Sequence, residues 1–130
     1  MAHYLDTSAL VKLVVAESES QALTAWLAET GDEWVSSDLA RTELLRVTRR
    51  AAPDLLLRAR EVLDSVTLVD VTTHVYEAAA RIEPVALRTL DAIHLAAAID
   101  LGDDLEAIVT YDDRLAHAAA ANGIPTTAPA

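Results

Sequence analysis

The first fifteen residues, MAHYLDTSALVKLVV (1–15), contain a short apolar run, three consecutive polar residues and a second apolar run. The polar residues are Asp6, Thr7 and Ser8, and each is of a type that favours the N-terminal cap of a helix. We predict a strand over residues 3–5 and a helix from Ser8 to about Val15. Since one capping residue is enough for a helix, the other two polar side chains are available for another role.

The rest of the chain repeats this order of strand and helix. Further strands are expected at 33–37, at 66–71 as a buried strand, at 107–111 and at 124–126 as a last edge strand. Helices are expected at about 17–29, 38–51, 53–64, 73–85, 89–101 and 113–122. Short apolar strands that alternate with helices favour an α/β fold with a small, mainly parallel sheet covered on both faces.

Length and composition favour one domain over residues 1–130, with 124–130 as a short C-terminal tail or edge strand. The chain has no Phe and no Cys, so its core must consist of Leu, Val, Ile and Ala, and thiolate chemistry is excluded. We find no signal-peptide pattern and no apolar run of about 18 residues, and therefore expect a cytoplasmic protein with no membrane span. The net charge of −11 favours cations or basic proteins as partners and argues against nucleic acid.

Four acidic residues stand at unusual positions. Asp6 and Asp112 each follow a predicted strand directly, whereas Glu43 and Asp91 each interrupt a line of apolar residues four positions before and after them on a helix. Each has an ordinary explanation when taken alone. Asp6 and Asp112 could be N-caps, Glu43 could pair with Arg46, and Asp91 could interact with the helix dipole.

Taken together, the four acids indicate a metal site. Sites in parallel sheets form at the carboxyl ends of the strands, and clustered carboxylates repel one another unless a cation joins them. Oxygen ligands favour Mg²⁺ or Mn²⁺. We therefore predict that Asp6 holds a metal, while Thr7 or Ser8 caps the helix and hydrogen-bonds to a carboxylate. His94, one turn after Asp91, is interpreted as a hydrogen-bonded helix residue and not as a ligand.

Four segments in this order resemble the PIN-domain family, most closely the VapC-type toxins of bacterial toxin–antitoxin pairs. They are YLDTSALVKL (4–13), ARTELLR (40–46), LRTLDAIHLAAA (87–98) and IVTYDDRLAHAA (108–119). The resemblance implies a three-layer α/β/α sandwich and an Mg²⁺- or Mn²⁺-dependent ribonuclease. It assigns catalysis and metal binding to Asp6, Glu43, Asp91 and Asp112, with Thr7, Ser8 and Thr110 in support. Asp113 is the alternative to Asp112, and the spacing from Thr110 favours Asp112.

The resemblance also implies an RNA substrate, a cognate antitoxin and a homodimer. RNA could follow the arginines of the third helix (Arg41, Arg46, Arg49 and Arg50), and the antitoxin is expected to inhibit through a basic and apolar segment. A non-catalytic PIN-fold binding domain is the main alternative. A receiver-like phosphoacceptor domain would carry a lysine after a late strand, but the only lysine is Lys12. A haloacid-dehalogenase-type phosphatase would carry a second Asp where Ser8 stands.

Overall fold

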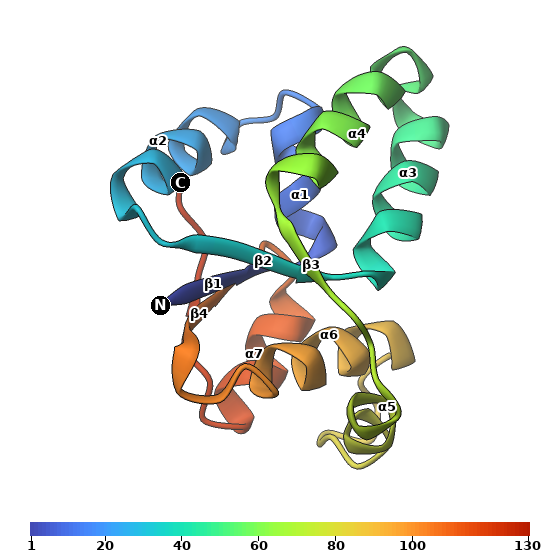
Figure 1. Cartoon of the computed structure of the whole chain (residues 1–130), viewed down its shortest axis with the longest axis vertical. Coiled ribbons are helices and arrows are strands. Elements are labelled where there is room, and N and C mark those ends of the chain that lie inside the picture. The colour runs from blue at the N-terminus through green and yellow to red at the C-terminus, as the bar shows by residue number, and fades with distance from the viewer.

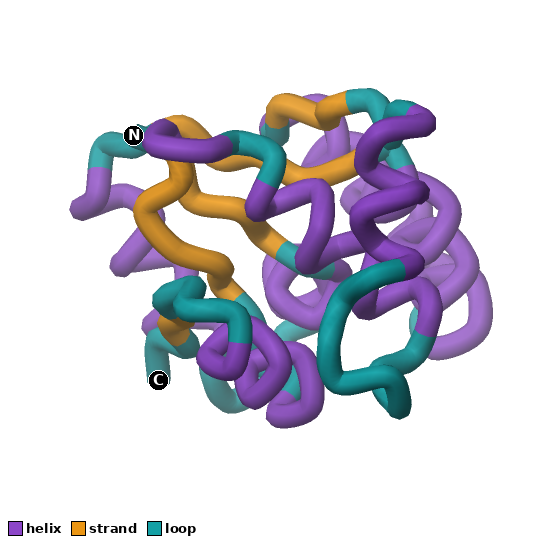
Figure 2. The backbone as a smooth tube through the Cα atoms, turned by 90° about the horizontal axis from the view of Figure 1, so that it is seen from below, coloured by secondary structure: helices purple, strands orange, loops and turns teal.

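One five-stranded sheet lies between two layers of helices in the computed structural model, which describes residues 1–130 (Figure 1). The strands are β1 (Ala2–Leu5), β2 (Glu33–Ser37), β3 (Thr67–Val69), β4 (Leu105–Val109) and β5 (Thr126–Thr127). Their spatial order is β3-β2-β1-β4-β5, and every pairing is parallel. Figure 2 shows the strands side by side in one sheet. The prediction of a mainly parallel sheet is confirmed.

The helices divide into two layers, as expected for an α/β/α sandwich. They are α1 (Thr7–Val14), α2 (Ser20–Thr30), α3 (Leu39–Ala51), α4 (Leu56–Ser65), α5 (Thr73–Ala80), α6 (Thr89–Ile99) and α7 (Asp113–Ala121). Helices α1 to α4 cover one face of the sheet, and α5 to α7 cover the other (Figure 1). No helix is both long and apolar enough to cross a bilayer.

The side chains of successive strand residues point to opposite faces and so supply two separate cores. Tyr4 and Ile108 belong to the core beneath α5, α6 and α7, whereas Leu5 and Val109 belong to the core beneath α1 to α4. Both cores are built mainly from Leu, Val, Ile and Ala, as the composition predicted. Because β1 and β4 are adjacent, the residues that follow Leu5 and Val109 emerge at the same edge of the sheet.

Several predicted boundaries are wrong. Helix α2 starts at Ser20 and not at residue 17, and α5 ends at Ala80 and not at Val85. Pro84 explains the early end of α5, because proline disfavours helical conformation in the residue before it. The segment 66–71 forms only the three-residue strand β3, which is exposed or half-buried because it lies at the edge of the sheet. The last strand is Thr126–Thr127, two residues later than expected.

Candidate active site

Asp6 lies at the carboxyl end of β1, where α1 begins. Its side chain is only 4% exposed, and its two oxygens have separate partners. Oδ1 accepts hydrogen bonds from the backbone N–H of Ala9 at 3.1 Å and from the hydroxyl of Ser8 at 2.6 Å. Oδ2 accepts from the hydroxyl of Thr110 at 2.7 Å. Burial raises the pKa of the Asp6 carboxyl, although these hydrogen bonds act in the opposite direction.

This arrangement corrects one prediction and supports another. Asp6 itself is the N-cap of α1, so the expectation that Thr7 or Ser8 caps the helix is wrong. Both hydroxyls do hydrogen-bond to carboxylates: Ser8 to Asp6, and Thr7 to Oε1 of Glu43 at 2.7 Å. Asp6, Thr7 and Ser8 therefore all take part in the hydrogen bonds at the start of α1.

Thr110 connects Asp6 to the segment after β4. Its hydroxyl donates to Asp6 and accepts from the backbone N–H of Asp112 at 3.1 Å. Ser8 makes a second connection, since its hydroxyl accepts from the backbone N–H of Tyr111 at 2.9 Å. Two hydroxyl groups therefore join the carboxyl ends of β1 and β4 around the buried carboxylate of Asp6.

Glu43 reaches the same edge from the first half of α3, and its partner is His94 on α6. The distance from Nε2 of His94 to Oε1 of Glu43 is 2.5 Å. Burial favours the neutral form of Glu43, but the hydrogen bond and attraction from His94, together with the Thr7 hydroxyl, outweigh it and lower the pKa of Glu43. The alternative explanation of Glu43, a pairing with Arg46, is not observed, because Glu43 pairs with His94.

His94 is held in turn by Tyr4. The hydroxyl of Tyr4 lies 2.8 Å from Nδ1 of His94, and both residues are buried. Burial raises the pKa of Tyr4 well above its ordinary value, so its hydroxyl keeps its proton. The contacts at Nδ1 and Nε2 together fix the orientation of the His94 ring between Tyr4 and Glu43. His94 is thus hydrogen-bonded as predicted, but its contact with Glu43 was missed because 51 residues separate the two in sequence.

Asp91 and Asp112 share a cation supplied by the chain itself. Nε of Arg88 lies 2.9 Å from Oδ2 of Asp91, and a terminal nitrogen of Arg88 lies 3.0 Å from Oδ2 of Asp112. Oδ1 of Asp112 accepts from the backbone N–H groups of Arg114 and Leu115 and caps α7. Asp113 is exposed, which supports the choice of Asp112.

The four predicted acids therefore lie in one hydrogen-bonded region but do not converge on a single point. No group of three or more His, Asp or Glu side chains is arranged to hold a metal ion. The chemistry of the donor set nevertheless fits Mg²⁺ or Mn²⁺, because all four donors are carboxylates and Arg88 already places a positive charge between two of them. Asp6, Glu43, Asp91 and Asp112 are the residues that could hold such an ion, after Asp91 and Asp112 release Arg88.

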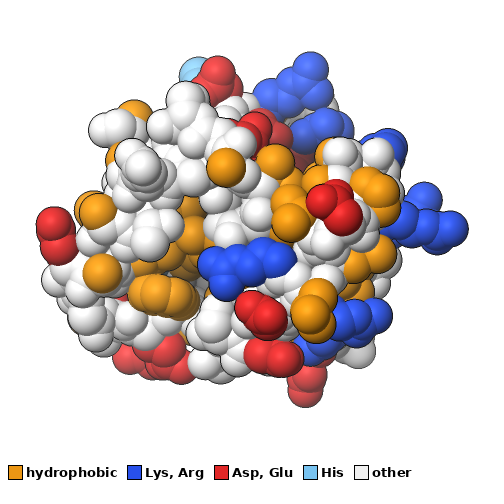
Figure 3. Space-filling view, turned by 90° about the horizontal axis from the view of Figure 1, so that it is seen from above, with side chains coloured by type: hydrophobic (Ala, Val, Ile, Leu, Met, Phe, Trp, Pro, Cys, Tyr) orange, Lys and Arg blue, Asp and Glu red, His pale blue; other side chains and the backbone are white.

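The predicted basic residues lie on the exposed side of α3. Arg46, Arg49 and Arg50 line a hollow of about 240 Å³. Arg41 is also exposed, and none of the four forms a salt bridge. Figure 3 shows basic side chains gathered on the side of the molecule where Figure 1 places α3. Arg46 and Arg50 are three and seven residues after Glu43, and therefore lie on the same face of the helix.

Comparison with known proteins identifies the family. The PIN domain model matches residues 3–121. Ribonuclease VapC47 of Mycobacterium tuberculosis (strain CDC 1551 / Oshkosh) is 42% identical over 130 residues, covering 97% of this chain and 96% of the relative. Ribonuclease VapC46 of Mycobacterium tuberculosis (strain ATCC 25618 / H37Rv) is 44% identical over 126 residues, with the same coverage of both chains.

Solved structures agree on the fold. Mycobacterium tuberculosis VapC20, described as a toxin that cleaves the sarcin–ricin loop, superposes with a TM-score of 0.79 at 17% identity, covering 98% of this chain and 99% of that one. A toxin–antitoxin complex from Klebsiella pneumoniae gives a TM-score of 0.71 at 24% identity and covers 98% of both chains. The family match and the full-length relatives together show that this chain belongs to the PIN-domain family, among its VapC-type members.

Proposed function

We propose that this protein is a divalent-metal-dependent endoribonuclease and the toxin of a type II toxin–antitoxin pair. The observation that carries the proposal is the placement of Asp6, Glu43, Asp91 and Asp112 at one edge of the sheet, joined by Thr7, Ser8, Thr110 and Arg88. The relatives named ribonucleases VapC47 and VapC46 support RNA as the substrate. The cytoplasm as its location stays a prediction.

Asp6, Glu43, Asp91 and Asp112 would hold Mg²⁺ or Mn²⁺, which would supply a lowered pKa for a water molecule and a positive charge beside the phosphate. The chain's own residues place the ligands. Ser8 and Thr110 fix the orientation of the buried Asp6 carboxylate, and a cation beside it would favour the ionised form that burial disfavours. Thr7 and His94 hold Glu43 ionised by hydrogen bonding to its Oε1. Preorganised carboxylates of this kind reduce the rearrangement needed at the moment of reaction.

The charge of −11 does not exclude RNA, because four of the ten Lys and Arg residues lie on the single helix α3. The exposed side of α3 offers Arg46 and Arg50 on the helix face that also carries Glu43. At a rise of about 1.5 Å per residue, Arg50 lies roughly 10 Å along the helix from Glu43. We propose that this row contacts phosphates of the RNA backbone beside the cleaved bond.

The activity is tested with purified protein and total cellular RNA, with and without Mg²⁺. We expect cleavage that EDTA abolishes and that Asp6→Asn or Asp91→Asn lowers by at least about 100-fold, because loss of one metal-site carboxylate impairs ion placement. Asp64→Asn is the matched control, since it removes the same charge from an exposed position on α4, away from these acids. The RNA ends are expected to be 5′-phosphate and 3′-hydroxyl.

Two results would refute this mechanism. Cleavage that persists in EDTA and in the Asp6→Asn protein would indicate a contaminating nuclease or a reaction that does not use these acids. Binding of RNA without cleavage in either Mg²⁺ or Mn²⁺ would instead identify the protein as a non-catalytic binding domain.

The partner is proposed to be a co-encoded antitoxin with a basic and apolar segment. The helices α1 and α2 enclose a groove of about 470 Å³ whose lining includes Leu13, Val14, Val15, Ala25 and Ala28. This groove is suited to an apolar helix face, while an antitoxin Arg could reach the carboxylates and compete with metal. Affinity for the partner should therefore fall with added salt and in the double variant Asp6→Asn/Asp91→Asn. Affinity that is indifferent to both would refute a basic residue in the site.

The homodimer stays a proposal by analogy with the family. The exposed apolar side chains of Tyr76, Val85 and Leu90, which are 55%, 86% and 47% exposed, support a contact surface around α5 and the start of α6. Sedimentation at several protein concentrations tests it, and Val85→Asp should shift the protein to a monomer.

A further inference from the structure

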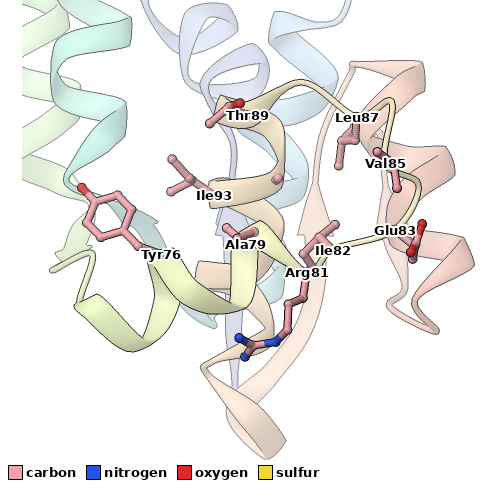
Figure 4. A pocket seen from close by; sticks show the side chains of 11 residues that line it. Tyr76, Ala79, Arg81, Ile82, Glu83, Val85, Leu87, Thr89 and Ile93 are labelled. Carbon is pink, nitrogen blue, oxygen red and sulfur yellow. The ribbon is translucent and has the colours of Figure 1, made fainter.

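Arg88 is the last residue before α6, at the end of the loop that follows α5. Its neighbour Leu87 packs against the core beneath the sheet, and the next residue, Thr89, starts the helix. Figure 4 shows Leu87 and Thr89 where this loop joins α6, at the hollow of about 390 Å³ that they help to line. The backbone of Arg88 is thus anchored on both sides, whereas its side chain is 58% exposed and able to move.

The contacts of Arg88 occupy the oxygens that a metal ion would need. Oδ1 of Asp112 is committed to the first turn of α7, so Oδ2 is the oxygen left for a cation. Arg88 holds this atom and Oδ2 of Asp91 at 3.0 Å and 2.9 Å. The side chains of Asp91 and Asp112 are 13% and 26% exposed, so solvent screens their mutual repulsion only in part. A divalent ion can join both carboxylates through these oxygens only if the guanidinium leaves.

A released Arg88 side chain has a suitable place beside the site. Arg88 also lines a groove of about 440 Å³ together with Arg114 and His117, and Asp113 is the only acid there. This groove runs along α7 from Asp113 to Ala118, and α7 covers the opposite face of the sheet from α3 (Figure 1). Its two arginines are suited to phosphate groups of a nucleic acid.

We propose that Arg88 is a resident counter-ion that exchanges with the metal. In the structure its guanidinium bridges Asp91 and Asp112. If these carboxylates held a divalent ion, the Arg88 side chain would turn to the groove of Arg114 and His117, where it would bind the RNA backbone. This inference rests on the proposed function, because it needs a metal site at the four acids.

The exchange predicts that one substitution, Arg88→Gln, strengthens the response to Mg²⁺ and weakens RNA cleavage. Arg88→Gln removes a competitor of the metal, so the Mg²⁺ concentration that gives half of the maximal rise in Tm should fall by about tenfold. At saturating Mg²⁺ the same variant should cleave RNA at least about tenfold more slowly, with a higher KM, because a phosphate contact is lost. A residue with only a structural role would weaken both properties together.

The measurement is a Mg²⁺ titration of thermal unfolding, followed by RNA cleavage, on wild type and three variants. Arg88→Lys keeps the charge but replaces the two nitrogens that each contact one carboxylate with a single ammonium, so its Mg²⁺ midpoint should lie between those of wild type and Arg88→Gln, and its KM should remain near that of wild type. Arg81→Gln is the matched control, since it removes an exposed positive charge from the same loop without a carboxylate contact. Circular dichroism of the metal-free proteins checks that each is folded.

The outcomes separate the inference from the function on which it rests. A wild type that responds to Mg²⁺ and cleaves RNA, together with an Arg88→Gln midpoint equal to or higher than that of wild type, overturns the exchange alone. A wild type with no response to Mg²⁺ or Mn²⁺ and no cleavage overturns both. An equal drop in the Mg²⁺ midpoint for Arg81→Gln would also overturn the exchange, because the change in net charge alone would then explain the drop.

Discussion

Thr110 offers a sharp test of the site, because its hydroxyl serves two groups and no water can easily replace it. The side chain is 2% exposed, donates to Oδ2 of Asp6 at 2.7 Å and accepts from the backbone N–H of Asp112 at 3.1 Å. Thr110→Val keeps the shape of the side chain and removes both hydrogen bonds. Asp6 then remains buried with Oδ2 unpaired.

The expected loss follows from these two contacts. A hydrogen bond to a charged group contributes about 1.5–3 kcal/mol to folding, and the partly buried N–H of Asp112 adds roughly 1 kcal/mol when it loses its acceptor. We therefore expect Thr110→Val to lower the free energy of unfolding by about 2.5–4 kcal/mol at pH 7.5. At roughly 3–4 °C per kcal/mol for a chain of this size, the Tm should fall by about 8–16 °C.

The pH dependence of the free energy of unfolding tests how the charge of Asp6 contributes to the effect of Thr110→Val. Burial raises the pKa of Asp6 above its ordinary value of 3.8, so the folded state holds the proton more tightly than the unfolded state. Such a group stabilises the fold below 3.8, and this contribution is lost as the pH rises through the folded-state pKa. Removing the Thr110 donor raises the folded-state pKa further. The stability difference between wild type and Thr110→Val should therefore grow as the pH rises from 5 to 7.5.

Urea unfolding of the metal-free proteins at both pH values provides the measurement. Thr30→Val is the matched control, because the Thr30 hydroxyl donates to a neutral acceptor, the carbonyl of Leu27, at 3.1 Å. Thr30→Val should lower the free energy of unfolding by about 1 kcal/mol, and by the same amount at both pH values. A Thr110→Val cost below 1 kcal/mol, or one that does not change with pH, would refute the view that Thr110 supports an ionised, buried Asp6.

Three further outcomes follow from single contacts. His94→Gln should destabilise the fold by about 1–3 kcal/mol in urea unfolding, because it disturbs the partners of both Tyr4 and Glu43, and an unchanged stability would contradict this. Ser36→Ala should leave the stability unchanged or raise it by up to about 1 kcal/mol, since the buried Ser36 hydroxyl has no hydrogen-bond partner, and a clear loss would reveal one. Gly31→Ala should lower stability by about 1 kcal/mol in thermal unfolding, because Gly31 ends α2 at φ 63° with no atom near a new Cβ, and a larger loss would indicate a steric clash.

Local signals in the sequence located most elements but could not identify their surroundings. The segment EWVSS formed β2 as predicted, because its Trp and Val favour strands and a helix-ending glycine precedes it. The apolar spacing beyond Ala80 suggested a longer α5, yet Ile82 and Leu87 pack against the core from a loop. Apolar periodicity records which side chains are buried, and a loop can bury them as well as a helix can. The position of β3 at the edge depends on the order of the strands in the sheet. The three residues of β3 do not indicate that order.

At the candidate site, the sequence does not indicate that the two oxygens of one carboxylate can have different partners. In the sequence analysis, helix capping and ligand binding are alternative roles for Asp6 and Asp112, because each residue is assigned one role. In the structure each carboxylate divides its two oxygens: Oδ1 of Asp6 caps α1 while Oδ2 accepts from Thr110, and Oδ1 of Asp112 caps α7 while Oδ2 holds Arg88. The cap fixes the orientation of the carboxylate, and the fixed orientation presents the second oxygen to the site. An Asp that caps a helix at the carboxyl end of a strand is therefore better placed to hold a cation than one without that duty, and at Asp6 the hydroxyl of Ser8 reinforces this by donating to the capping oxygen.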